Sequence, residues 1–179
     1  MRDSFIAGVL LIGGLGLPLS PMAYAQNVHQ DPRGRFSIDL PPGFTLASQH
    51  LDRIYVFEIP EARLLVSVVP GASDRERLWR SALDDFTGPG VPFPPAEFVS
   101  NLEVNGNPAR QAWYVFDAGH EGANMPYTVL LGAVVLRDSG TGIVCFSLLH
   151  GKAAARWGDP LRAAFRSIHV PGAPVISGI

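Results

Sequence analysis

The sequence predicts an α+β domain in which helices flank both faces of a mostly antiparallel sheet of six to eight strands. Several short segments alternate polar and apolar residues or are apolar throughout, and turn residues separate them. Consecutive strands joined by such short turns pair antiparallel. Two other segments carry apolar residues at helical spacing, one between the strand groups and one near the end of the chain. These two helices can cover the two faces of the sheet.

Residues 1–25 have the order of a secretory signal peptide. Arg2 precedes an apolar stretch from Phe5 to Leu19, and the small-residue triplet Ala23-Tyr24-Ala25 follows. We therefore expect cleavage between Ala25 and Gln26. An uncleaved membrane anchor is the competing interpretation, but an apolar run of about 15 residues is shorter than the roughly 20 that span a bilayer. The prediction is an exported protein of the periplasm, with secretion as the alternative and without stable membrane insertion after cleavage.

The mature chain begins with an expected N-terminal extension, residues 26–34. The first strand runs from Arg35 to Leu40, where polar and apolar residues alternate, and Pro41-Pro42-Gly43 ends it. Two more strands are predicted near Arg53–Ile59 and Arg63–Val69. The second of these is apolar on both faces, which places it in the middle of a sheet that is covered on both sides.

The pattern Ser73-Asp74-Arg75-Glu76 is that of a capping box and predicts the start of the first helix. Glu76 and Arg80 are spaced to form an ion pair on one face of it. Gly88-Pro89-Gly90 ends the helix. Its apolar stripe consists of Trp79, Ala82, Leu83 and Phe86.

The second group of strands is predicted at Ala96–Val104, Ala109–Phe116, Tyr127–Leu136 and Ile143–Leu149. Asn105-Gly106 joins the first two, because both residues tolerate the positive φ angles of a tight hairpin turn.

A final helix is expected to begin with Asp159 as its N-cap and Pro160 at its first helical position. Its buried stripe consists of Leu161, Ala164, Phe165 and Ile168. We therefore expect residues 35–170 to form a single domain and residues 171–179 to form a flexible tail.

The segment from Phe36 to Phe44 resembles the opening strand and Pro-Gly-aromatic turn of the PsbP/Mog1-like fold family, which includes bacterial DcrB-like exported proteins. Here the turn ends in Phe44, where the family often has tryptophan. The capped first helix, the long meander and a last helix carrying Phe165-Arg166-Ser167-Ile168 are also similar, so the resemblance covers about Arg35 to Val170. It implies the same fold but no shared chemistry, since family members are binding, assembly or accessory factors or proteins of unknown role.

The composition and motifs exclude several classes of function. A formal net charge of −2 favours neither nucleic acid nor an anionic membrane surface as a partner. No phosphate-binding glycine loop, G-x-S-x-G elbow, H-E-x-x-H or C-x-x-C motif is present. The single cysteine, Cys145, lies in an apolar strand and is expected to be buried and inert. We therefore predict no catalytic residue, no cofactor and no metal site.

The alternative is a small periplasmic hydrolase or metal-dependent enzyme centred on the loop that contains His120 and Glu121. A histidine beside a carboxylate can act as an acid or a base, or provide half of a metal site. Two adjacent residues do not make a site, however, and solvated loop residues of this kind are common.

The leading interpretation is an exported, non-catalytic binding or accessory protein. It would dock a protein partner or a small ligand of the cell envelope through a sheet edge and the loops Gly88–Pro95 and Gly119–Pro126. Phe93 is an aromatic anchor or a plug of the sheet edge, and Arg75 and Arg77 form a docking surface for an acidic partner or a solvated helix face. The candidate partner-binding residues are Phe93, His120, Glu121, Arg75 and Arg77.

Overall fold

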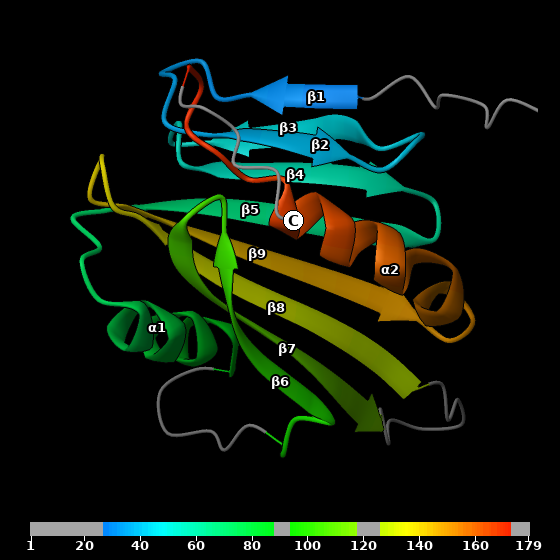
Figure 1. Cartoon of the computed structure of the whole chain (residues 1–179). Helices are drawn as coiled ribbons and strands as arrows, with labels where there is room; N and C mark the ends of the chain where they lie inside the picture. Colours follow the sequence, from blue (N-terminus) through cyan, green and yellow to red (C-terminus); the bar gives the residue numbers. More distant parts are fainter. Residues whose placement is uncertain (1–26, 88–93, 118–125, 173–179) are drawn as a thin grey trace, which may run out of the picture.

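The computed structural model describes residues 27–87, 94–117 and 126–172. Within these residues, seven strands form one antiparallel sheet, which confirms the predicted fold class (Figure 1). From edge to edge the sheet consists of β3 (Thr45–His50), β4 (Ile54–Ile59), β5 (Ala62–Pro70), β9 (Thr141–His150), β8 (Pro126–Leu136), β7 (Asn107–Asp117) and β6 (Phe98–Val104).

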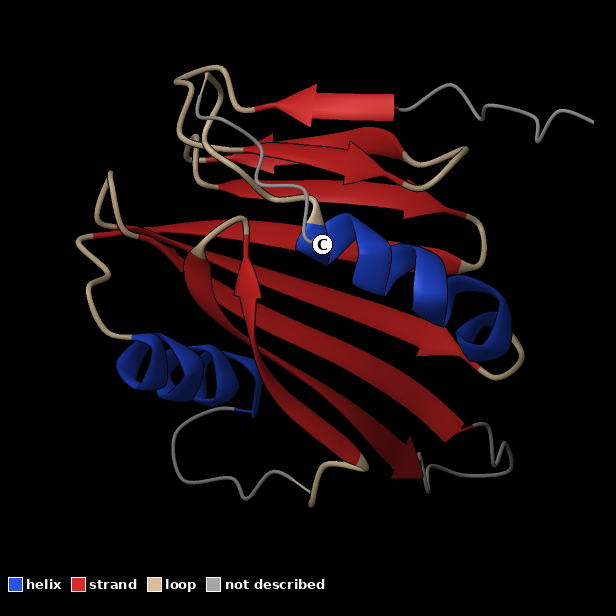
Figure 2. Cartoon of the chain, viewed as in Figure 1, coloured by secondary structure: helices blue, strands red, loops and turns tan. Residues whose placement is uncertain are grey.

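The two described helices pack on opposite faces of this sheet (Figures 1 and 2). Helix α1 (Arg75–Thr87) covers one face through Leu78 and Trp79, which contact buried residues of β7 and β8. Helix α2 (Ala153–Arg166) covers the other face, and Phe165 lies in the larger core cluster. The doubly apolar strands β8 and β9 thus have buried residues on both faces, as predicted. Strand β5 was predicted to be covered on both sides as well, but only its α2 face is closed, because α1 does not extend over it and Leu65 and Val69 stay half-buried.

The segment expected to be an N-terminal extension contains strand β1 (Asn27–Gln30), which pairs antiparallel with β2 (Ser37–Leu40). These two strands form a separate ribbon that lies beside α2 and is tied to the chain after α2 through a bridge between Ser37 and His169. The alternating pattern of the first predicted strand identified its buried face, but alternation carries no information about which strand is the partner.

Strand β3 was not predicted from the sequence. It is an edge strand whose residues are mostly exposed, and a register shift between Leu46 and Ser48 interrupts its pairing with β4. An exposed edge strand needs little apolar alternation, so its sequence lacks the usual signal. The hairpin between β6 and β7 was predicted correctly: Asn105 and Gly106 have φ angles of 49° and 77°.

The start of α1 differs from the predicted capping box. The backbone N–H of Arg77 donates to Oδ1 of Asp74 at 2.7 Å, so Asp74 and not Ser73 caps the helix. Glu76 bonds to Arg110 of β7 at 2.7 Å instead of pairing with Arg80. The reason is that β7 places the guanidinium of Arg110 next to the first turn of α1. The spacing of residues along the helix cannot reveal such a long-range contact.

Helix α2 begins at Ala153, so Asp159 is not its N-cap and Pro160 lies inside it. Residues 153–158 were not predicted to be helical, and their contacts with other elements explain why the helix begins earlier. The ring of Trp157 packs edge-on against Phe44, with 5.6 Å between centroids. Gly158 lies so close to Trp113 that a Cβ atom there would be 2.6 Å from the indole ring. These contacts outweigh the local preference of proline for a helix start.

Cys145 is buried and free, as predicted, and burial raises the pKa of its thiol well above the ordinary value. It belongs to the core cluster on the α2 face of the sheet.

A buried carboxylate holds the ribbon to the sheet. Asp31 is 1% exposed and accepts hydrogen bonds from Arg35, at 2.7 and 2.8 Å, and from the hydroxyl of Tyr55 on β4. Burial alone would raise the pKa of Asp31, but these bonds and the N–H of Arg35 outweigh it and place the pKa well below the ordinary value. Burial and the bond to Asp31 raise the pKa of Tyr55 to about 12.

We expect Asp31→Asn to lower the free energy of unfolding by about 3 kcal/mol at pH 7, because it leaves Arg35 without its buried counter-ion. A carboxyl whose pKa is depressed in the folded state stabilises it above the unfolded pKa of about 3.9 and loses that effect as the pH falls further. Urea titrations from pH 7 to pH 2 should therefore show a steep acid limb in the wild type and a shallower one in the variant. Asp52→Asn, which removes the exposed pair with Arg33, is the control and should cost under about 1 kcal/mol.

We expect Gly158→Ala to destabilise the protein by about 1–3 kcal/mol, although alanine favours helices by about 1 kcal/mol over glycine. The cause is the clash of the new methyl group with Trp113, and thermal unfolding measures it. In a Trp113→Leu background the same change should be neutral or stabilising. Stabilisation in the wild-type background would contradict the close packing of α2 on β7.

Candidate functional site

The α1 face of the sheet is only partly covered. A helix is about 10 Å wide, whereas the six spacings between seven strands add up to about 29 Å. Helix α1 lies over β7, β8 and β9, where Ala112 and Leu131 are fully buried. On β4 and β5 the residues of the same face, Ile54, Leu65 and Val69, remain half-buried.

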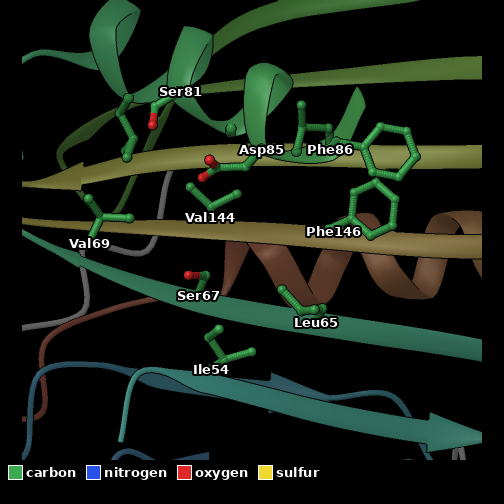
Figure 3. Close-up of a pocket in the computed structure, with 12 residues that line it drawn as sticks. Ile54, Leu65, Ser67, Val69, Ser81, Asp85, Phe86, Val144 and Phe146 are labelled. Atoms are coloured by element: carbon green, nitrogen blue, oxygen red, sulfur yellow. The ribbon is translucent and has the colours of Figure 1, made fainter. Parts of the chain in front are cut away.

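A groove of about 520 Å³ runs between α1 and this open part of the sheet (Figure 3). Its volume is that of a typical small-molecule site. The floor comes from strands and one wall from the helix. The lining residues are Ile54, Leu65, Ser67, Val69, Leu131, Val144 and Phe146 of the sheet and Leu78, Ser81, Ala82, Asp85 and Phe86 of α1.

Two aromatic rings from different elements meet at the groove. The rings of Phe86 on α1 and Phe146 on β9 are tilted, with 4.3 Å between centroids, and Figure 3 shows them side by side. Phe86 is 38% exposed, and its ring also lies 6.0 Å from that of Phe116. Such pairs stabilise beyond the area that they bury, so they give this end of the groove a fixed shape.

Three polar side chains interrupt the apolar lining. Ser67 comes from β5, and Ser81 and Asp85 lie one turn apart on α1. In Figure 3 the Asp85 carboxylate projects from the helix over Val144. Asp85 forms no ion pair with another described residue, so the carboxylate is free for a ligand.

The lining can bind a ligand, but it carries no pair of groups for nucleophilic catalysis. The described residues of the groove include no histidine, cysteine or lysine that could activate the hydroxyl of Ser67 or Ser81. Across the described ranges, no three His, Cys, Asp or Glu side chains gather in a way that could hold a metal ion. No helix within those ranges is long and apolar enough to cross a membrane.

The predicted partner-binding residues lie elsewhere. Arg75 bonds to Glu76 at 3.0 Å, so its charge is engaged within the protein, while Arg77 is exposed. Neither lines the groove. Phe93, His120 and Glu121 fall outside the described residues and remain predictions, as does the cleavage between Ala25 and Gln26.

The groove was not predicted from the sequence, although the pattern of apolar strand residues indicates it. Leu65 belongs to a strand that is apolar on both faces, and this pattern predicts cover on both sides. One helix of 13 residues on the α1 face is too narrow for a sheet of this width. A mismatch between apolar sheet surface and available helices therefore predicts an open apolar face.

Comparisons with known proteins identify the fold. No protein-family model and no curated protein sequence matches the chain. The structure superposes on the Ran-binding protein Mog1p of Saccharomyces cerevisiae with a TM-score of 0.59 and 14% identity, over 83% of this chain and 96% of that one. It superposes on CyanoP, the cyanobacterial PsbP of Synechocystis, with a TM-score of 0.57 and 15% identity, over 88% and 96% of the two chains. The chain has the PsbP/Mog1-like fold.

A third protein with a similar structure is LpqN of Mycobacterium tuberculosis, which is described as involved in cell envelope biogenesis. It matches with a TM-score of 0.50 and 12% identity, over 82% of this chain and 86% of that one. The PsbP/Mog1-like fold predicted from the opening strand and turn is thus confirmed. At these identities the similarity establishes the fold, and the chemistry has to be argued from the groove.

Proposed function

We propose that this protein is an exported, non-catalytic binding protein that holds an apolar ligand, or the apolar part of a protein partner, in the groove beside α1. The observation that carries the proposal is the groove itself: apolar side chains of β4, β5 and β9 stay half-buried beside a helix that is too narrow to cover them. Contiguous apolar surface of this kind on a soluble domain is typical of a binding site.

Two proteins of similar structure support a binding role and an envelope location. Mog1p is a Ran-binding protein, and LpqN is involved in cell envelope biogenesis. Together with the signal-peptide pattern of residues 1–25, the second description supports a place in the cell envelope. We infer that the ligand or partner is met in the periplasm, after export.

We expect the mature protein to begin at Gln26. N-terminal sequencing of protein from the periplasmic fraction should read Gln26-Asn27-Val28. Ala25→Arg should block processing, because the peptidase site requires a small residue, and should leave a longer precursor on an immunoblot. Finding the protein only in the cytoplasmic fraction, with Met1 still present, would contradict export.

We expect the neutral probe N-phenyl-1-naphthylamine to bind with enhanced fluorescence, because the groove offers it an apolar, water-poor surface. Leu65→Gln should weaken this binding about tenfold, since a polar side chain on the floor removes apolar contact and introduces an amide that loses hydrogen bonds to water when the probe binds. Fluorescence titration measures the change.

The matched control is Leu51→Gln. Leu51 is 89% exposed and does not line the groove, so its replacement should leave probe binding unchanged. Equal loss in both variants, or no binding by the wild type, would contradict the proposed function.

A further inference from the structure

The charge in the groove lining is only negative among the described residues. Asp85 is the one charged side chain among its described lining residues, and the lining includes no lysine, arginine or histidine to balance it. Farther along the same open face, the guanidinium of Arg63 is held at 3.2 Å by Glu58, its cross-strand neighbour. Basic charge on that part of the sheet is therefore already neutralised within the protein.

The position of Asp85 in the helix strengthens this negative end. The last turn of α1 contains Asp84 and Asp85 and no basic residue. Unsatisfied carbonyl groups give the C-terminal end of a helix a partial negative charge, and carboxylates there are unfavourable, whereas a cation is stabilising. The groove lining has one negative and no positive side chain, and the C-terminal end of α1 is negative as well. These two independent observations indicate that a cation would be favoured beside Asp85.

We propose that the ligand of the groove is a small cationic amphiphile, with an apolar chain and one ammonium group; this inference rests on the proposed function. The chain would lie on Ile54, Leu65, Val144 and Phe146, the apolar floor. The ammonium group would donate hydrogen bonds to the Asp85 carboxylate and to the hydroxyl oxygen of Ser67 or Ser81, the polar groups that Figure 3 shows around the same floor.

The chemistry of the groove selects against related ligands of other charge. A fatty acid would bring its carboxylate to Asp85 and to the negative end of α1, which costs affinity through like-charge repulsion. A neutral amphiphile would gain the apolar contact but would leave Asp85 without a counter-ion as water is displaced. The volume of about 520 Å³ suits a single short chain and head group.

Three ligands with the same eight-carbon chain test the proposal: octylammonium, octyl glucoside and octanoate, each below its micelle concentration. Isothermal titration at pH 7 and low salt should show octylammonium binding about fivefold more tightly than octyl glucoside, with octanoate the weakest. In Asp85→Asn the advantage of octylammonium should disappear, because octylammonium loses its counter-ion while octyl glucoside no longer leaves a desolvated carboxylate unpaired and binds at least as tightly as before. Asp84→Asn is the matched control: it removes the neighbouring carboxylate, which does not line the groove, and should keep most of the advantage.

The outcomes separate this inference from the proposed function. Equal affinities for octylammonium and octyl glucoside in the wild type, or an advantage that survives Asp85→Asn, would overturn the cationic ligand but leave an apolar binding protein. If neither the three ligands nor N-phenyl-1-naphthylamine bound, both the cationic ligand and the proposed binding function would be overturned. A Lys/Leu amphipathic peptide that binds and displaces octylammonium at lower concentration would overturn the small amphiphile in favour of a basic peptide.

Discussion

The rest of the structure depends on one constraint, which is that a wide sheet with apolar residues on both faces must be covered on both faces. In the described part of the chain two helices are available for seven strands. On the α2 face the shortage is met by the β1–β2 ribbon, which places Phe36, Ile38 and Leu40 over the strands that α2 does not reach. On the α1 face no described element does the same, and the groove results.

The ribbon can do this because a buried ion pair fixes it. Asp31 lies in the turn between β1 and β2, and its bonds to Arg35 and Tyr55 join that turn to the main sheet. A short two-stranded ribbon is marginally stable by itself, so its position depends on this polar contact and on the apolar residues beneath it. The two faces therefore differ: one is closed by the ribbon, and the other keeps an open apolar groove.

The elements with strong periodicity were predicted well from the sequence, and the failures have identifiable causes. The hairpin at Asn105-Gly106, the long strands β7–β9 and the burial of Cys145 follow from local chemistry. The early start of α2 depends on Trp157 and Gly158 finding Phe44 and Trp113, which are far away in the sequence. Asp85 was not among the predicted site residues. Its place beside the floor of the groove depends on how α1 lies on the sheet, which no local pattern determines.

The central pairing of β5 with β9 has a consequence for how the chain reaches its final form. It joins Ala62–Pro70 to Thr141–Leu149, so the sheet cannot close until nearly the whole polypeptide is available. Contacts so distant in sequence carry a large loop-closure cost, which makes folding slow compared with that of helical proteins.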